Sequence, residues 1–252
     1  MLIIAHRGYS SRYPENSVLA FEKAIDAGAD YIETDLRFSL DGTIVCCHDP
    51  DLKRIAGRAD AIEDLKAQDL KKVALFNGQS ILSLQDVLAI AVRADHRVQV
   101  MFDVKIPTEA MLDTVLPLVE TMKMSDDIMY GARTVDHAES LKKRDSKFSI
   151  LGMPKKISLI PAFIEAGVTA IRVWEEEITP EIVSTIKAAG IPVWITAGLK
   201  RQGEAAGDIT CDRIKALDHL GVDAVLVNDP ALARQVSERG NQNNQLAAGA
   251  SA

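Results

Sequence analysis

Residues 2–38 read LIIAHRGYSSRYPENSVLAFEKAIDAGADYIETDLRF and contain the pattern that decides the fold. The apolar run Leu2–Ala5 predicts a β-strand, and Tyr31–Phe38 predicts a longer second strand. Between them, apolar residues from Val18 to Ile25 recur at helical spacing, and a glycine follows the segment. A strand, a helix and a strand in this order predict a βαβ unit of a parallel sheet.

The same alternation continues along the chain. It predicts six further strands, each followed by a helical pattern, at Val98–Val104, Ile128–Tyr130, Phe148–Leu151, Ala170–Trp174, Val193–Thr196 and Ala224–Val227. Eight such units predict a single-domain α/β fold, a (β/α)8 TIM barrel over residues 1–239. A doubly wound open sheet is the alternative, but no GxGxxG motif follows the first strand.

Three segments depart from this alternation. Thr43–Cys47 follows an Asp-Gly turn and predicts a hairpin partner for the second strand. Residues 49–80 are charged and predict a loop insertion after that strand, with a short helix near Ile62–Leu70. Residues 240–252 are rich in Asn, Gln and Ala and predict a disordered tail.

Composition excludes several classes of protein. The 252 residues are 47% hydrophobic and 26% charged, which is typical of a globular domain. A net charge of −7 without a basic run argues against a nucleic-acid partner. The sequence contains no apolar window of about 18 residues, so it predicts no membrane span. Three cysteines, two of them adjacent, favour a reduced, cytoplasmic setting, whereas the oligomeric state stays open.

Titratable residues gather where the predicted strands end, which is where barrels place their active sites. The residues concerned are His6, Arg7, Glu33, Asp35, His48, Asp103 and Lys105. The two-residue period of a strand puts Glu33 and Asp35 on one face. A Glu-x-Asp pair is commonly a solvated face, but this strand reads as buried, and buried carboxylates need a cationic partner. Mg²⁺ or Ca²⁺ suits such oxygen ligands, and Asp103 is a third candidate.

Two histidines beside a metal suit cleavage of a phosphodiester. One of His6 and His48 would accept a proton and the other would donate one, although a histidine at a strand end is more often structural. The guanidinium of Arg7 would bind the phosphate with its fork of donors.

The ordered motifs HRG (6–8), PENS (14–17), GADYIETD (28–35) and HD (48–49) resemble the opening of the glycerophosphodiester phosphodiesterase family. The resemblance implies a TIM barrel that uses a divalent metal to release sn-glycerol 3-phosphate and an alcohol from a small-molecule glycerophosphodiester. It implies the following roles: His6 and His48 as the acid/base pair; Glu33, Asp35 and Asp103 as metal ligands; Arg7 and Lys105 at the phosphate or substrate. Trp194 is assigned to the substrate site as well.

The chain departs from the family pattern at four places. Ser17 replaces the usual Thr, a mild change because both can cap the helix. Asp103 stands where Glu is usual, so we expect it to reach a metal through water. Ile195–Gly198 replaces a Thr-Val-Asn pattern, and Asn228 replaces an Asp. Two alternatives remain: a lysophospholipase-D-like enzyme with an apolar trough, and a catalytically silent barrel that binds a phosphorylated ligand. The trough would draw on Leu75, Phe76, Trp174 and Trp194, and the run Glu175–Glu177 is expected to be a solvated loop.

Overall fold

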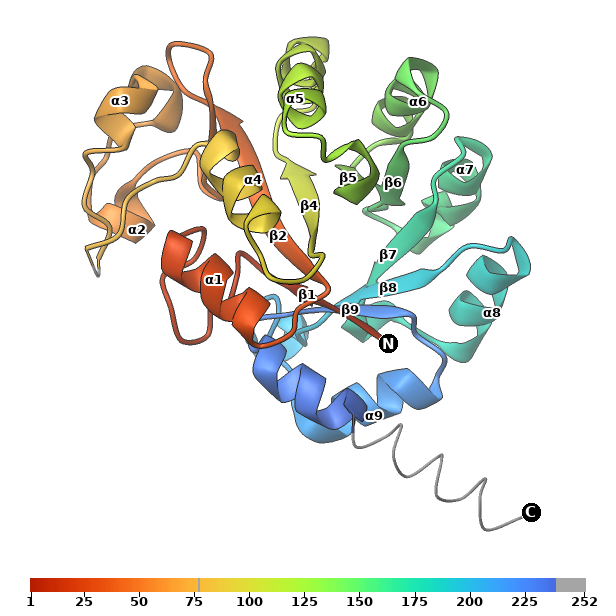
Figure 1. Cartoon of the computed structure of the whole chain (residues 1–252). Helices are drawn as coiled ribbons and strands as arrows, with labels where there is room; N and C mark the ends of the chain where they lie inside the picture. The colour runs from red at the N-terminus through yellow and green to blue at the C-terminus, as the bar shows by residue number, and fades with distance from the viewer. Residues whose placement is uncertain (77, 239–252) are drawn as a thin grey trace.

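The computed structural model describes residues 1–76 and 78–238 and contains a closed barrel of eight parallel strands (Figure 1). The barrel closes because β1 pairs in parallel with both β2 and β9. This confirms the predicted (β/α)8 fold and excludes the open sheet. The strands in barrel order are β1 (Leu2–Ala5), β2 (Tyr31–Phe38), β4 (Gln99–Val104), β5 (Ile128–Ala132), β6 (Ser149–Gly152), β7 (Ala170–Trp174), β8 (Val193–Thr196) and β9 (Ala224–Val227).

Helices surround the barrel (Figure 1). Most begin at a Ser or Thr whose hydroxyl oxygen accepts a hydrogen bond from a backbone N–H of the first turn, which satisfies a donor that would otherwise be orphaned. A further helix covers residues 230–238. The barrel helices are α1 (Val18–Asp26), α4 (Leu84–Val92), α5 (Glu109–Thr121), α6 (Val135–Arg144), α7 (Ile160–Glu165), α8 (Pro180–Ala188) and α9 (Cys211–His219). The loops of the barrel also contain the 3₁₀ turns η2 (Ser125–Asp127), η3 (Ile157–Leu159), η4 (Glu175–Glu177) and η5 (Lys200–Gln202).

The insertion packs as a small unit beside the barrel. The hairpin strand β3 (Ile44–Cys46) pairs antiparallel with β2, as predicted. The single helix predicted near Ile62–Leu70 is wrong: the backbone is extended at Leu65 and Lys66, and this divides the segment. The insertion therefore contains α2 (Lys53–Ala56), η1 (Ile62–Asp64) and α3 (Ala67–Leu70), which share an apolar cluster with the hairpin.

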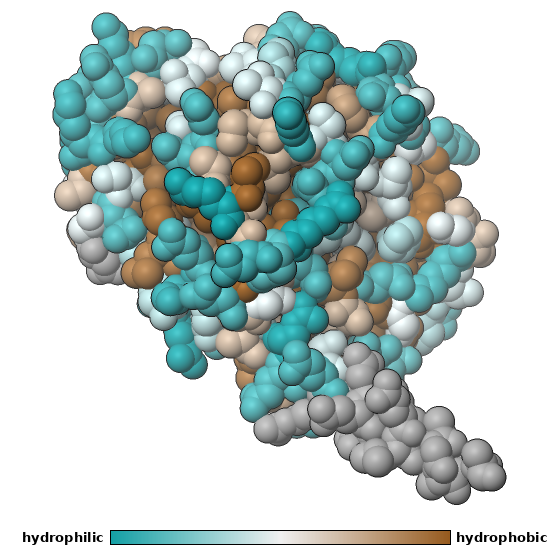
Figure 2. Space-filling view, in the orientation of Figure 1, coloured by the Kyte–Doolittle hydropathy of each residue, from teal (hydrophilic) through white to brown (hydrophobic). Residues whose placement is uncertain are grey.

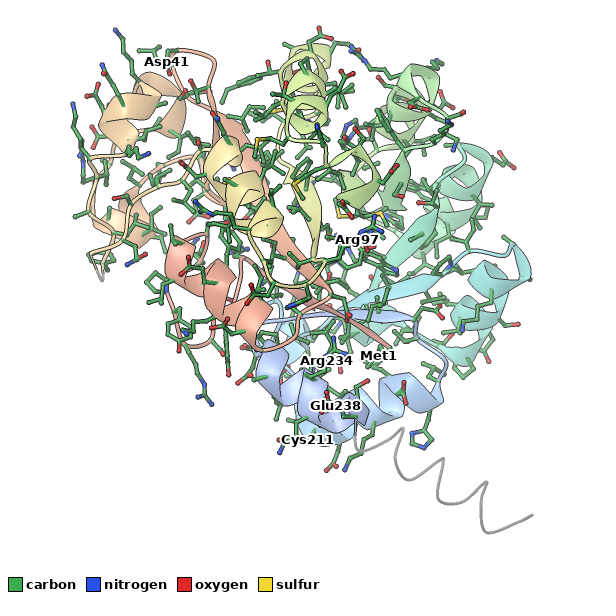
Figure 3. All side chains as sticks on the ribbon, in the orientation of Figure 1. Met1, Asp41, Arg97, Cys211, Arg234 and Glu238 are labelled. Atoms are coloured by element: carbon green, nitrogen blue, oxygen red, sulfur yellow. The ribbon has the colours of Figure 1, made fainter. Side chains whose placement is uncertain are left out.

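Contacts at the amino ends of the barrel strands hold the helix at residues 230–238 in place. Arg234 donates to the carbonyl of Gly28 and pairs with Asp30 at 2.7 Å, and Figure 3 shows Arg234 on the same side of the molecule as Met1. Asp30 in turn accepts from the backbone N–H of Ile3. The opposite ends of the strands are thereby left for a site. The predicted tail at residues 240–252 lies outside the described residues.

The outer surface is mixed in polarity. Figure 2 shows hydrophilic residues over much of the face in view, with apolar residues visible between them. None of the helices in the described ranges combines the length and the apolar character that crossing a membrane requires.

Candidate active site

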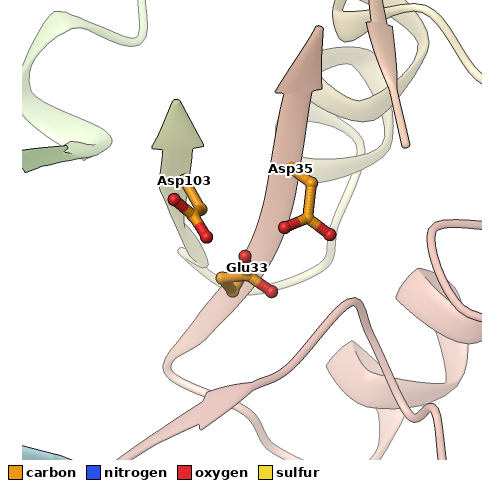
Figure 4. Close-up of side chains that lie close together, drawn as sticks. All are labelled: Glu33, Asp35 and Asp103. Carbon is orange, nitrogen blue, oxygen red and sulfur yellow. The ribbon is translucent and has the colours of Figure 1, made fainter. Parts of the chain in front are cut away.

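Three buried carboxylates converge at the carboxyl ends of β2 and β4 (Figure 4). Glu33 and Asp35 come from β2 and Asp103 from β4, where Asp35 and Asp103 are paired neighbours. Each offers an oxygen, and these oxygens all lie within 4.8 Å of one another. The strand period and the parallel register thus bring the predicted acidic residues together.

Cations surround two of these carboxylates. Lys105 Nζ lies 2.6 Å from both Asp35 Oδ1 and Asp103 Oδ2, and Arg7 Nε lies 3.1 Å from Asp35 Oδ2. Arg133 grips Asp103 with two N–H groups, one of them 2.7 Å from Oδ1. Burial opposes ionisation, but Lys105 and Arg7 hold the pKa of Asp35 below its ordinary value, and Arg133 with Lys105 does the same for the pKa of Asp103.

Glu33 is in the opposite situation. Burial, together with the negative charges of Asp35 and Asp103, raises the pKa of Glu33 well above its ordinary value. Its Oε2 accepts one hydrogen bond, from the backbone N–H of Arg7 at 2.9 Å. The cluster therefore carries a carboxyl group whose negative charge is poorly compensated.

The donor set fits a hard divalent cation. Asp35 Oδ1 is buried and, among residues 1–76 and 78–238, finds no aligned hydrogen bond, although Lys105 is close. Oxygen donors from two or three carboxylates are the ligands that Mg²⁺ and Ca²⁺ take in proteins. Within the described residues Glu33 has no ion pair and Asp35 Oδ1 has no aligned hydrogen bond, whereas both oxygens of Asp103 accept from Arg133. Glu33 and Asp35 therefore keep oxygens for such an ion.

The PENS segment (residues 14–17) forms hydrogen bonds that orient Asp35 of the carboxylate cluster. Asn16, at a φ of 52°, donates from Nδ2 to Asp35 Oδ2 at 3.0 Å and accepts from the Thr34 hydroxyl at 2.9 Å. Ser17 begins α1 and accepts from Ala20 N–H. One short segment thus starts the first helix and orients a carboxylate of the second strand.

His6 follows β1 and has a fixed tautomer. Its Nδ1 lies 2.8 Å from Asn228 Oδ1, while Asn228 Nδ2 donates to both Ala206 O and Asp208 Oδ1 at 2.8 Å. Both amide hydrogens of Asn228 are thus used, so its oxygen must accept the proton on His6 Nδ1. Burial, reinforced by Arg7, lowers the pKa of His6 to about 4. His6 is therefore neutral at pH 7, with a lone pair on Nε2.

His48 is held from two sides. Its Nδ1 lies 2.6 Å from Asp49 Oδ1, and its carbonyl accepts two N–H groups of Arg37, at 3.0 and 2.6 Å. Asp49 also pairs with Arg54 of the insertion. Burial and then Lys105 lower the pKa of His48 below its ordinary value.

Glu15 joins the insertion to the barrel. Its carboxylate accepts two hydrogen bonds of 2.7 Å from Arg54 and two from Arg7, at 3.1 and 3.2 Å. A bidentate carboxylate between two guanidinium groups fixes both of them. Arg54 of the insertion therefore helps to position both Arg7, through Glu15, and His48, through Asp49.

A cavity of about 360 Å³ opens over the cluster. Of the predicted site residues it is lined by His6, Arg7, Glu33, His48, Asp103 and Lys105, and Asp35 lies beside it in the carboxylate cluster. An adjoining hollow of about 320 Å³ shares His6, Arg7 and His48.

Trp194 does not line the cavity, so its assignment to the substrate site stays a prediction that the geometry does not support. It is the second residue of β8, is 3% exposed, and packs edge-to-face on Tyr31 with ring centroids 5.1 Å apart. Trp174, the last residue of β7, lines the cavity instead. Depth along the strand separates the two, because only the strand ends face the opening.

Sequence reasoning missed three cations of the cavity wall: Arg133, Arg172 and Lys200. Arg133 comes directly after β5, at a strand end like the residues that were predicted, and Lys200 lies in the turn η5 after β8, whose course no local pattern reveals. Arg172 did carry a signal, since it is the single charged residue within the apolar strand Ala170–Trp174.

The loop after β8 requires a glycine at residue 198, within the stretch Ile195–Gly198 that departs from the family pattern. Gly198 has a φ of 115°, and a Cβ there would lie 2.4 Å from the carbonyl oxygen of Ala205. Its N–H donates to Glu175, which also pairs with Arg213 and is only 7% exposed. The expectation that the whole run Glu175–Glu177 is solvated is therefore wrong at Glu175, because this carboxylate anchors the loop.

Known proteins resemble this chain along most of its length. A sequence profile of the glycerophosphoryl diester phosphodiesterase family matches residues 6–232. A glycerophosphodiester phosphodiesterase of Caldanaerobacter subterraneus is 24% identical, with 91% of this chain and 94% of that protein covered. The uncharacterized protein YqiK of Bacillus subtilis is 35% identical over 50% of this chain, and the match spans 56% of YqiK.

A solved structure shares the fold. It is an Oleispira antarctica phosphodiesterase in complex with the product sn-glycerol-3-phosphate, with a TM-score of 0.80 at 18% identity over 94% of this chain and 97% of that one. The chain spans about half the length of two of the curated relatives that it matches. Because the profile covers nearly the whole barrel, this chain belongs to the glycerophosphoryl diester phosphodiesterase family.

Proposed function

We propose that this chain hydrolyses glycerophosphodiesters to sn-glycerol 3-phosphate and an alcohol, with the help of a divalent cation. The observation that carries the proposal is the joint placement of His6, His48 and the carboxylate cluster in one cavity. Neither histidine alone would indicate a reaction, but two histidines beside a candidate cation site suit transfer of a phosphoryl group.

Glu33 and Asp35 would hold Mg²⁺ or Ca²⁺, and Asp103 would add charge to the site directly or through water. The bound ion would supply electrostatic stabilisation of the non-bridging phosphate oxygens. Arg7 would add a fixed guanidinium, because Glu15 and Asp35 already hold it in place. Lys105, between Asp35 and Asp103, would contact the same phosphate.

The two histidines are suited to different roles. His6 is neutral at pH 7 and has its Nε2 lone pair available, so it would accept the proton of the oxygen nucleophile that attacks phosphorus, which in the net hydrolysis is water. The pKa of His48 is also lowered, but less completely, because Asp49 at Nδ1 opposes the effects of burial and Lys105; His48 would therefore be the ring that carries the proton to the leaving oxygen.

The cavity wall argues against a lysophospholipase-D-like enzyme. Trp174 is flanked by Arg172 and Lys200, so that side of the cavity is cationic rather than apolar. Leu75 and Phe76 border a separate hollow with Arg54. A short polar alcohol therefore suits the cavity better than an acyl chain.

The test is release of sn-glycerol 3-phosphate from a set of glycerophosphodiesters. We expect turnover with Mg²⁺ or Ca²⁺, loss of turnover after exhaustive chelation, and recovery when the ion is added back. Lysophospholipids should be poor substrates. Full turnover without a divalent ion would contradict the metal requirement, and specific binding of a glycerophosphodiester without turnover would indicate the silent barrel.

A further inference from the structure

One cation of the cavity wall lacks a counter-ion. Arg172 is 8% exposed on β7, and its Nη1 is buried without a hydrogen-bond partner. Among residues 1–76 and 78–238 no carboxylate lies within 4.0 Å of its guanidinium, in contrast to Arg133, which Asp103 neutralises. A buried, unpaired guanidinium is costly, so its presence calls for a ligand.

A second cation and an aromatic ring complete this wall. Lys200 Nζ lies 3.2 Å from the centroid of the Trp174 ring, and Arg172 Cζ lies 4.7 Å from it. Within the described ranges Lys200, like Arg172, has no carboxylate at ion-pair distance. Burial lowers the pKa of Arg172 to about 10, which is consistent with a charge that the protein itself does not compensate. The ring face compensates two cations only in part.

The basic wall and the carboxylate cluster lie on opposite sides of one cavity. Around the barrel β7 is four strands from β2 in either direction, so Arg172 faces Glu33 across the opening. A phosphodiester held near Glu33, His6 and His48 would send one of its two arms toward Arg172. The glycerol arm carries only hydroxyl groups, so a charged group there must belong to the alcohol.

We infer that Arg172 and Lys200, beside Trp174, form a subsite for a second anionic group, a carboxylate or a phosphate monoester, on the alcohol arm of the substrate. The inference rests on the proposed function and narrows its substrate class to glycerophosphodiesters with an anionic alcohol. Guanidinium binds carboxylate and phosphate with the same fork of donors, so both remain within the class.

The same wall selects against cationic alcohols. A Trp face ordinarily attracts a quaternary ammonium group such as choline. Here Arg172 and Lys200 already occupy the surroundings of the Trp174 ring, so a choline arm would meet like charge. Glycerophosphocholine should therefore be a poor substrate.

A matched pair of substrates tests the inference. Glycerophosphoglycerol and glycerophosphoglycerate differ only in a hydroxymethyl group replaced by a carboxylate, and glycerophosphoglycerol phosphate tests the phosphate source. We expect kcat/KM to be roughly 10- to 100-fold higher for one or both anionic substrates, the range of a charge-assisted hydrogen bond. Arg172→Met and Lys200→Gln should each reduce this preference about tenfold or more. Arg201→Gln, an exposed neighbour outside the cavity wall, should preserve it.

The outcomes separate the two proposals. Equal kcat/KM for neutral and anionic arms would overturn the subsite while leaving the phosphodiesterase intact. A loss that is equal for all substrates in Arg172→Met would also overturn it, because Arg172 would then bind the scissile phosphate. If none of the substrates is turned over, the proposed function fails, and titration of tryptophan fluorescence with the same pair decides the subsite: tighter binding of the anionic compound supports it, and equal binding refutes it. If Arg172→Met does not fold, Lys200→Gln provides the test: a reduced preference for the anionic substrate supports the subsite, and an unchanged preference refutes it.

Discussion

Asn228 shows how one residue sets the chemistry of another. Its amide nitrogen donates to Ala206 O and Asp208 Oδ1, and its amide oxygen accepts from His6 Nδ1. A neutral amide fixes the tautomer of His6 without adding charge, whereas the Asp that is usual in the family would favour an imidazolium. Burial and then Arg7 lower the pKa of His6, and the neutral Asn228 amide fixes the tautomer while opposing that shift less than a carboxylate would.

Replacing Asn228 should separate these two effects. Asn228→Asp places a negative charge beside His6 and raises its pKa, so the acidic limb of the pH profile of kcat/KM should move to higher pH. Asn228→Leu removes the acceptor, and kcat should fall by about 10- to 100-fold, a usual cost for losing a group that orients a catalytic ligand or base. An unchanged acidic limb in Asn228→Asp would show that His6 is not the titrating base.

Glu33 carries a stability cost that depends on pH. Its pKa is raised in the folded protein, so the cost is absent below the unfolded value near 4.3, grows as pH rises from there to the folded value, and is constant above it. Metal-free Glu33→Gln should therefore melt a few degrees higher than wild type at pH 8, since about 1 kcal/mol corresponds to roughly 2–4 °C at this size. The gain should vanish near pH 4.

Differential scanning calorimetry with chelator measures this gain. Exposed Glu22→Gln is the control and should show no pH-dependent difference. Adding Mg²⁺ or Ca²⁺ should raise the melting temperature of wild type more than that of Glu33→Gln. A destabilised Glu33→Gln at pH 8 would contradict the charge assignment.

At the scale of elements, the loop between β8 and α9 sets the position of Asn228. Gly207 N–H donates to Ala197 O at 2.7 Å, and Asn228 N–H donates to Gly207 O at 2.8 Å. A Cβ on Gly207 would lie 2.2 Å from Asn228 Oδ1. The loop is thus fastened to the end of β9 at the point where Asn228 meets His6.

Gly207→Ala should therefore act on catalysis and not only on stability. The added methyl displaces the Asn228 amide, and kcat should fall about tenfold or more through His6. Gly203→Ala is a matched control, because Gly203 lies in the same loop with a φ of 81°, compared with 91° at Gly207, and a Cβ there meets nothing within 4 Å. Both substitutions strain the backbone, so equal kcat values would mean that the Gly207 contact has no catalytic role.

At the scale of the whole molecule, the barrel could be predicted because each apolar run has to be buried and each helical pattern fixes one crossover. The expected bounds of β1, β2, β7, β8 and β9 match the structure to the residue. Local sequence patterns say less about how deeply a side chain is buried in the barrel and about which side chains form ion pairs. They could not show that Trp174 faces the opening while Trp194 is buried, nor that Arg133 pairs with Asp103 across neighbouring strands.

The central claim is that His6 and His48 work together on a phosphodiester held at the carboxylate cluster. The most direct measurement is kcat for sn-glycerol 3-phosphate release by wild type, His6→Gln, His48→Gln and, as a control, His137→Gln, a buried histidine of α6 outside the cavity. We predict that the first two variants lose about 10²–10⁴-fold in kcat while their circular dichroism and melting temperatures stay near those of wild type, and that His137→Gln retains its kcat. Wild-type turnover by either His6→Gln or His48→Gln would contradict the account.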